Sequence, residues 1–328
     1  MNILITGSAG HLGEALVRSF SAKGHQAFGV DLKDSEFTTH VGSIVDADFV
    51  EQCIKGMDAV LHAATLHKPH VATHSRQDFV DTNITGTLNL LEAAVAAGVK
   101  AFVYTSTTST FGDSMRPQPG EPAVWVTEDL PSRHKNIYGL TKTCAEGLCQ
   151  LFSRNMSLPC IVLRTSRFFP EDDDDSNRRA AFEADNLKVN ELLFRRVDIE
   201  DIVSAHELAI DKAPQLGFDR FIISAPTPFH RVDAAELVSN APAVVKRYLP
   251  NYVSVYQSRG WTMFPSIGRV YDSSHACETL GWRPEFTFGR ALKRLSEGRD
   301  YQSELARSVG SKGYHDVVFE DGPFPVDE

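Results

Sequence analysis

The chain opens with Met1-Asn-Ile-Leu-Ile-Thr6, and Gly7-Ser-Ala-Gly10-His-Leu-Gly13 follows directly. The apolar, β-branched first half predicts a buried parallel strand, and the glycines stand where a helix should begin. Gly7 can make a tight turn, Gly10 lets the backbone approach a pyrophosphate, and Gly13 lets the helix pack close to the strand. Because the N-terminus of that helix offers unpaired N–H groups to a phosphate, the stretch predicts a dinucleotide-binding turn.

A second apolar strand is expected around Gln26-Ala-Phe-Gly-Val30 and ends at Asp31. In dinucleotide-binding folds, an acid about 20 residues after the glycine turn hydrogen-bonds the adenosine ribose hydroxyls. The same carboxylate repels the 2′-phosphate of NADP, so we expect NAD as the cofactor. Lys33 is the residue that could soften this preference.

Composition narrows the class of protein. The 328 residues contain 33 Lys and Arg against 43 Asp and Glu, a net charge of −10, so we expect neither nucleic acid nor an anionic membrane as partner. The first strand begins at Asn2, which leaves no room for a signal peptide, and no apolar run approaches the roughly 20 residues that span a bilayer. We therefore expect a cytoplasmic protein. The five cysteines are scattered without a Cys-x-x-Cys pair, which favours reduced thiols.

Strands and helices alternate through the first half of the chain, which predicts an α/β fold with a Rossmann-type, doubly wound parallel sheet and a small C-terminal substrate lobe. The expected helices span 47–55, 77–97 and 136–155, and the expected strands span 58–62, 101–105, 160–164 and 218–224. We assign 1–168 to the dinucleotide-binding domain, with 197–227 returning to it. The lobe comprises 169–196 and 228–308, and 309–328 form an irregular tail.

Two polar clusters carry less information. The run Glu171-Asp-Asp-Asp-Asp175-Ser-Asn-Arg-Arg179 is expected to be a solvated loop. His67-Lys68-Pro69-His70 with His74 has no convincing carboxylate partner, and the proline interrupts helical spacing. We therefore expect no metal site.

Tyr138-Gly-Leu-Thr-Lys142 places a phenol and an ammonium four residues apart, hence on one face of a helix. Oxidation of a secondary alcohol by NAD needs a base, and a nearby lysine favours the phenolate. Lowering the phenol pKa by about three units takes about 4 kcal/mol. Hydroxyls from the run Thr105-Ser-Thr-Thr-Ser-Thr110 can hold the substrate oxygen at the sheet edge where open α/β sheets bind ligands.

Beyond these motifs, the chain resembles the extended short-chain dehydrogenase/reductase superfamily, specifically the NAD-dependent epimerase/dehydratase group. The resemblance rests on residues 6–13, 58–64, 83–93, 105–112, 138–142, 163–164, 197–201, 269–274 and 280–284. It implies that Tyr138 is the general base or acid, that Lys142 tunes its pKa and binds ribose, and that Thr107, five residues before Gly112, is the catalytic hydroxyl. The expected cofactor contacts are Gly7, Gly10, His11, Leu12, Gly13, Asp31, Ser43, Ile44, Ala63, Ala64, Thr65, Asn83, Thr105, Tyr138, Lys142 and Thr165.

Departures from the group's pattern narrow the expected reaction. Thr108 and Ser109 stand where sugar-nucleotide 4,6-dehydratases carry Asp-Glu, so we do not expect dehydration. Arg167 replaces an asparagine that is usual in enzymes of uridine diphosphate sugars, and the segment from Arg167 to Asp198 is short for a nucleotide cradle. Ser43 stands where many members of the group have an aspartate that hydrogen-bonds the amino group of adenine, so we expect modestly weaker binding of the adenine.

The sequence thus predicts an NAD-dependent oxidoreductase that acts on a secondary alcohol or ketone of a sugar-like or other small polyhydroxy compound. Arg167 suits an acidic group on the substrate, and His67 and Thr108 are further expected substrate contacts. A sugar epimerase remains open. A non-catalytic, redox-sensing NAD-binding regulator is less favoured, because such proteins tend to lose the Tyr/Lys pair. Helices 77–97 and 136–155 are expected to form a homodimer.

Overall fold

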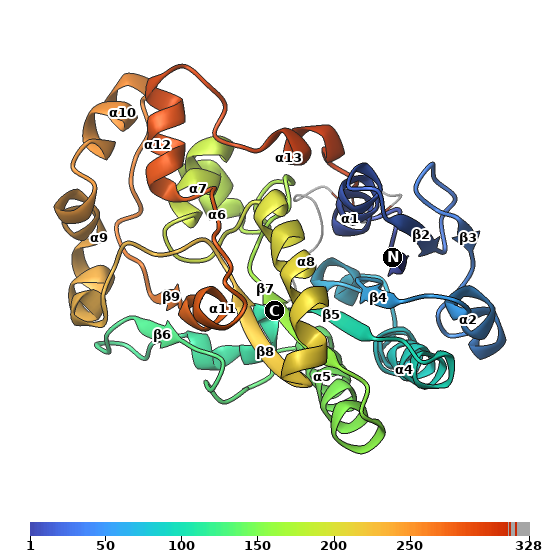
Figure 1. Cartoon of the computed structure of the whole chain (residues 1–328). Coiled ribbons are helices and arrows are strands. Elements are labelled where there is room, and N and C mark those ends of the chain that lie inside the picture. The colour runs from blue at the N-terminus through green and yellow to red at the C-terminus, as the bar shows by residue number, and fades with distance from the viewer. Residues whose placement is uncertain (314, 316–318, 320–328) are drawn as a thin grey trace.

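The protein is described here by a computed structural model that places residues 1–313, 315 and 319. Its centre is a seven-stranded sheet of order β3-β2-β1-β4-β5-β7-β8, in which every neighbouring pair is parallel. The expected α/β fold with a parallel, Rossmann-type sheet is confirmed (Figure 1). The strands are β1 (Asn2–Thr6), β2 (Gln26–Asp31), β3 (His40–Val41), β4 (Ala59–His62), β5 (Ala101–Thr107), β7 (Cys160–Thr165) and β8 (Phe218–Ile223).

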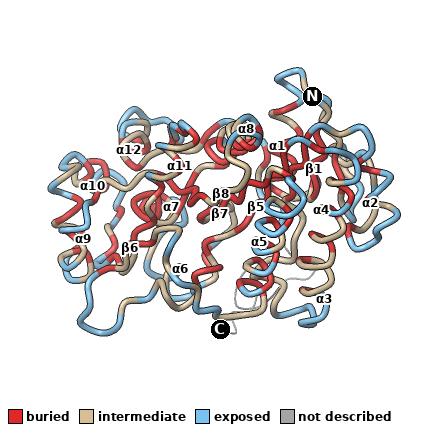
Figure 2. Tube along the Cα trace, turned by 60° about the horizontal axis from the view of Figure 1, so that its bottom comes forward, coloured by how far each residue is buried: buried red, intermediate tan, exposed pale blue. Residues whose placement is uncertain are grey.

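Helices cover both faces of this sheet, because alternate residues of each strand point to opposite sides. Ile3 and Ile5 pack on one side with α1 (His11–Ala22) and α8 (Ile199–Leu216). Leu4 packs on the other side with α2 (Ala47–Ile54), α4 (Gly86–Ala97) and α5 (Ile137–Met156). The strands are therefore buried on both faces, as Figure 2 shows for the centre of the molecule.

A second apolar cluster lies to one side of the sheet. It draws on α7 (Ala184–Glu191), α9 (Ala234–Tyr248), α10 (Tyr252–Arg259) and α12 (Phe288–Ser296), beside the short α6 (Ser176–Ala181). A two-stranded parallel ribbon joins β6 (Val124–Val126) to β9 (Arg269–Tyr271), so the cluster also takes in chain from the first half.

Beyond residue 273 the chain alternates between the two clusters. α12 packs in the second cluster, whereas α11 (Ser274–Thr279), the buried Trp282 and α13 (Glu304–Val309) pack on the sheet cluster, with α13 beside α1 and α8. The C-terminal part of the chain therefore returns to the helix that begins at the glycine turn.

The helix expected over 77–97 is interrupted. α3 (Arg76–Val80) is followed by a π-helical turn at Asp81–Thr85 before α4 begins at Gly86. π-turns are often found at functional sites. This one turns the Asn83 side chain inward, toward the segment that follows β4. None of the described helices is long and apolar enough to cross a bilayer.

Candidate active site

A cavity of about 550 Å³ opens at the carboxyl edge of the sheet. Every residue expected to contact cofactor or substrate lines this cavity, with the exception of Asn83. The cavity also extends to residues for which the sequence analysis expected no contact with cofactor or substrate, among them Glu171, Arg195, Arg269 and Lys312. Their neighbours in space come from distant parts of the chain.

The glycine turn has the geometry that a dinucleotide requires. Gly7 adopts a positive φ of 77°, and a Cβ there would lie 2.8 Å from the backbone nitrogen of Ala64. A Cβ on Gly13 would lie 1.9 Å from the carbonyl oxygen of Gly7. Gly10 precedes α1 without any side-chain cap, so the first N–H groups of the helix face the cavity unblocked. The turn therefore fits a pyrophosphate at this helix end.

Asp31 ends β2 beside that turn. Its Oδ2 accepts a hydrogen bond from the backbone nitrogen of Ala9 at 3.0 Å, and its Oδ1 accepts one from that of Lys33 at 3.0 Å. Each carboxylate oxygen has further lone pairs, and Asp31 lines the cavity, so it can also accept from ribose hydroxyls.

Asn83 lies behind the cavity wall and is 1% exposed. Its Oδ1 accepts from the Thr65 hydroxyl and from the Leu66 nitrogen, both at 2.8 Å, and its Nδ2 donates to Thr141 Oγ1 at 3.0 Å. The expected cofactor contact is therefore not made at the cavity surface. Asn83 instead ties the segment after β4 to α5.

Tyr138 and Thr107 both line the cavity. Tyr138 lies in the first turn of α5, and Thr107 ends β5. Burial raises the pKa of the Tyr138 phenol to about 12, and the Thr107 side chain lowers this pKa only in part. The phenol is therefore protonated at neutral pH in the ligand-free chain.

Lys142 follows one turn later on α5, and its Nζ donates to the carbonyl oxygen of Thr105 at 2.7 Å. The ammonium also lies over the ring of Tyr104, 4.1 Å from its centroid. Burial lowers the pKa of Lys142 to about 7, against the opposing effect of Glu146. The expected acidification of Tyr138 by Lys142 is not seen in the ligand-free chain, because burial dominates the pKa of both groups.

Two other threonines expected at the cofactor use their hydroxyls within the protein. The Thr105 hydroxyl lies 2.8 Å from Nε2 of His206 on α8, and Thr165 Oγ1 donates to the carbonyl oxygen of Ser106 at 3.1 Å. Burial lowers the pKa of His206 to about 4, so this imidazole is neutral at pH 7. Both threonines line the cavity while fixing the ends of β5 and β7.

His67 lines the same cavity and directly precedes the short helical turn Lys68–Ala72. Its ring centroid lies 6.1 Å from that of Tyr138, and burial, followed by the charge of His70, lowers its pKa to about 3. A neutral imidazole near the phenol suits hydrogen bonding to a hydroxyl-bearing substrate. Among the described residues, no three His, Cys, Asp or Glu side chains are grouped so that they could hold a metal ion.

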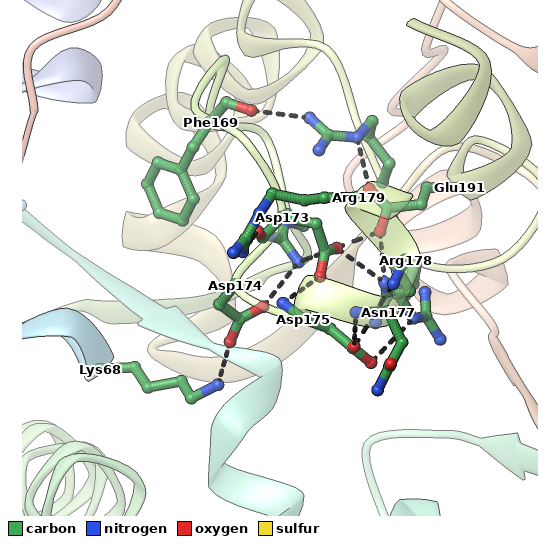
Figure 3. A network of polar contacts seen from close by, with 12 residues as sticks. Lys68, Phe169, Asp173, Asp174, Asp175, Asn177, Arg178, Arg179 and Glu191 are labelled. Atoms are coloured by element: carbon green, nitrogen blue, oxygen red, sulfur yellow. Dashed lines mark hydrogen bonds and ion pairs between the residues drawn. The ribbon is translucent and has the colours of Figure 1, made fainter. Parts of the chain in front are cut away.

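The charge run at 171–179 is solvated only in part. Asp172, Asp175, Ser176 and Asn177 are exposed, whereas Asp173 is only 5% exposed and accepts a hydrogen bond from Arg167 at 2.9 Å. Asp174 pairs with Lys68, and Asp175 caps α6 by accepting from the Asn177 nitrogen at 2.9 Å (Figure 3). Asp173 and Asp174 turn inward because they neutralise cations from other segments, which composition alone does not reveal.

Arg167 is consequently a paired cation. Besides Asp173, its guanidinium lies 3.5 Å from Asp174 and 4.0 Å from Glu191. Glu191 also pairs with Arg195 and, at 2.8 Å, with Arg196. The cavity wall here is a network of alternating charges, in which Arg167 is one member (Figure 3).

The chain is similar to known enzymes over most of its length. The sequence model of the NAD-dependent epimerase/dehydratase family matches residues 3–217 of this chain. A 3β-hydroxysteroid dehydrogenase/Δ5→4-isomerase of Mycobacterium tuberculosis (strain CDC 1551 / Oshkosh) is 32% identical over 154 residues, which are 44% of this chain and 40% of that protein. The chain thus spans less than half of this relative's length. A UDP-glucose 4-epimerase of Lactobacillus helveticus is 24% identical over 87% of this chain and 92% of its own.

A solved structure extends the likeness to the fold. A short-chain dehydrogenase/reductase superfamily protein from Agrobacterium tumefaciens, crystallised with bound NAD, superposes with a TM-score of 0.66. It is 25% identical and covers 94% of this chain and 97% of its own. With the glycine turn, the parallel sheet and the Tyr138/Lys142 helix in place, the chain belongs to the NAD-dependent epimerase/dehydratase family of extended short-chain dehydrogenases/reductases.

Proposed function

We propose that the protein is an NAD-dependent oxidoreductase that transfers hydride at a secondary alcohol or ketone of a sugar-like or small polyhydroxy compound. One observation carries the proposal: the glycine turn, Asp31, Tyr138 and Thr107 line a single cavity. Membership of an NAD-dependent family supports it.

The residues divide the work as follows. The backbone at Gly7 and Gly10 receives the pyrophosphate, and Asp31 accepts from the adenosine ribose. NAD, when bound, supplies the hydride acceptor. Thr107 holds the substrate oxygen, and Tyr138 takes or returns its proton.

The direction of proton transfer follows from the environment of Tyr138. A buried phenol with a pKa of about 12 is a proton donor, so the ligand-free site is set to protonate an alkoxide formed by ketone reduction. In oxidation the phenolate must be stabilised. Bringing the pKa from about 12 to 7 takes about 7 kcal/mol, and the Lys142 ammonium is bonded to the Thr105 carbonyl.

We propose that the substrate carries an acidic group. Three arginines, Arg167, Arg195 and Arg269, line this end of the cavity together with the carboxylates Glu171, Asp172 and Asp174. Arg167 and Arg195 both pair with Asp173, so a substrate carboxylate would share these guanidinium groups, and Arg269 is a further candidate contact.

The test is Tyr138→Phe, with Tyr252→Phe as a matched control whose hydroxyl bonds Pro242 in the second cluster. Sugar acids, aldonates and neutral sugars are screened for NAD reduction, and the best substrate is used for both variants. We expect Tyr138→Phe to lose at least 100-fold in kcat with NAD affinity retained. An unaffected rate would remove Tyr138 from the mechanism.

The second candidate is a sugar epimerase, favoured by the alignment with a UDP-glucose 4-epimerase over nearly the whole of both chains. In an epimerase the hydride returns to the opposite face of a ketone, so no NADH accumulates. Product formation without a change in absorbance at the NADH band would select this activity. A redox-sensing regulator would instead bind NAD and turn over no compound in the screen.

A further inference from the structure

The last described part of the chain borders the cavity. α13 packs beside α1 (Figure 1), and after it residues Lys312 and Gly313 line the same cavity as the glycine turn and Tyr138. We call residues 310–313 with His315 the C-terminal strap. Nothing in its own sequence predicts a role at the active site.

Glu171 holds this strap in place. Its Oε1 accepts hydrogen bonds from Ser311 Oγ at 2.8 Å, from the Lys312 nitrogen at 3.1 Å and from the Gly313 nitrogen at 3.2 Å. The same oxygen lies 2.8 Å from His11 Nε2, and the Glu171 side chain is 9% exposed. Burial alone would raise the pKa of Glu171, but His11 and Ser311 lower it to about 2, so the carboxylate is ionised at neutral pH.

The strap also contacts the two other walls of the cavity. Lys312 Nζ pairs with Glu14 in the first turn of α1, and the Lys312 nitrogen lies 3.0 Å from His11 Nε2. His315 Nε2 lies 3.1 Å from the carbonyl oxygen of Pro69, in the turn that follows His67. One short segment thus joins the start of α1, the loop after β7 and the turn beside the phenol.

Charge gives this arrangement a consequence for the cofactor. Glu14 and Glu171 place two carboxylates at the end of α1 that we assign to the pyrophosphate. Two anions so close to a diphosphate oppose its binding. The Lys312 ammonium offsets Glu14 together with Arg18, whose Nε lies 2.8 Å from the same carboxylate, while the strap engages Glu171 through three donors.

We propose that the C-terminal strap is part of the dinucleotide site and closes it, so that NAD and NADH leave only after Glu171 releases residues 311–313. The inference rests on the proposed dinucleotide site. It assigns Glu171 and Lys312 as positioning residues for cofactor retention.

The test compares full-length variants Glu171→Ala, Ser311→Ala and Lys312→Ala with the unaltered chain. Glu304→Ala is the matched control, because Glu304 lies on the adjoining α13 with its side chain 94% exposed. NADH release is followed by stopped-flow fluorescence. Amide hydrogen exchange of the peptide spanning 308–315 is measured with and without NAD, and thermal unfolding checks that each variant folds.

A strap predicts faster NADH release by about tenfold in all three variants and no change in Glu304→Ala, together with slower exchange of the strap amides when NAD binds. If the two side chains acted on the cofactor only through their charges, Glu171→Ala and Lys312→Ala would change the rate of NADH release in opposite directions. Removing the Glu171 carboxylate would then slow release, whereas removing the Lys312 ammonium would speed it.

Slower or unchanged release from Glu171→Ala, or strap amides that NAD leaves unprotected, would overturn the inference while leaving the proposed function intact. Failure of the unaltered chain to bind NADH would reject both.

Discussion

The buried residue Lys142 is expected to lower the free energy of unfolding of the chain. The residue is 1% exposed, and burial lowers the pKa of its ammonium to about 7 from an ordinary value near 10.5. Below about pH 7 the Lys142 ammonium is charged in both the folded and the unfolded chain, and burying this charge lowers the free energy of unfolding. The penalty is relieved as the pH rises from 7 toward 10.5, because only the folded chain then loses the proton.

We therefore expect Lys142→Met to raise the free energy of unfolding at pH 6 by about 1–2 kcal/mol while abolishing turnover. The gain should shrink at pH 9. Urea denaturation at the two pH values measures it, with the exposed Lys55→Met as control. A variant less stable than the unaltered chain at pH 6 would show that the bond to the Thr105 carbonyl outweighs the burial of the charge.

At the scale of elements, Asp201 fastens α8 to the segment before α12. Its two carboxylate oxygens accept from the backbone nitrogens of Glu285 at 2.8 Å and Phe286 at 2.9 Å. Burial raises the pKa of Asp201 to about 7 in spite of these two bonds. An acid with a raised folded-state pKa stabilises the fold below its unfolded value, near 4, and this contribution is lost as the pH rises to about 7.

Because the pKa of Asp201 lies about three units above its ordinary value, the free energy of unfolding should fall by at most about 4 kcal/mol between pH 4 and 7. Asp201→Asn carries a neutral amide where the unaltered chain carries a protonated carboxyl at pH 5, so the two free energies of unfolding should differ there by less than about 1 kcal/mol. The amide cannot ionise, so the variant should become the more stable of the two by pH 8. Denaturation curves from pH 5 to 8 test this, with Asp211→Asn on the exposed side of α8 as control. A gap that is constant with pH would mean that Asp201 titrates normally.

An element could be predicted from the sequence when the interactions that form it join residues close together in the chain. The turn at Gly7 and the strand before it were predictable, because steric demands on a glycine and β-branched runs are local. The π-helical turn at Asp81–Thr85 and the buried Asp173 were not, since each depends on a distant partner: Leu66 for the first and Arg167 for the second. The pairing of β6 with β9, across more than 140 residues, leaves no local signal either.

At the scale of the whole molecule, the cavity is assembled from the two ends of the chain and its middle. The glycine turn lies at one end, Tyr138 near the middle, and Lys312 at the other. The sequence could therefore place the cofactor and the phenol from their motifs, but not the cavity wall built by Arg195, Arg269 and the strap. Arg269 is placed by the pairing of β9 with β6, Arg195 by its ion pairs with Asp173 and Glu191, and the strap by the packing of α13 on α1 and α8.

The outer face of α5 predicts the oligomeric state. Leu140, Cys144, Leu148 and Leu151 follow helical spacing along it, and both Leu140 and Leu151 are 41% exposed. α4 packs beside α5, so two copies of this helix pair can bury a continuous apolar surface about a twofold axis, provided that it exceeds about 1,000 Å². We expect a homodimer of about twice the chain mass of 36.3 kDa by light scattering.

Leu140→Glu combined with Leu151→Glu should give a folded monomer, because burying two carboxylates at the interface costs more than the contact yields. Val232→Glu, at an 88% exposed site away from α5, is the control and should leave the mass unchanged. Leu140 is two residues from Tyr138 on the same helix, so loss of the partner should also loosen the phenol and lower kcat while NADH affinity persists. A monomeric mass for the unaltered chain would refute the dimer and leave the stripe on α5 without a partner.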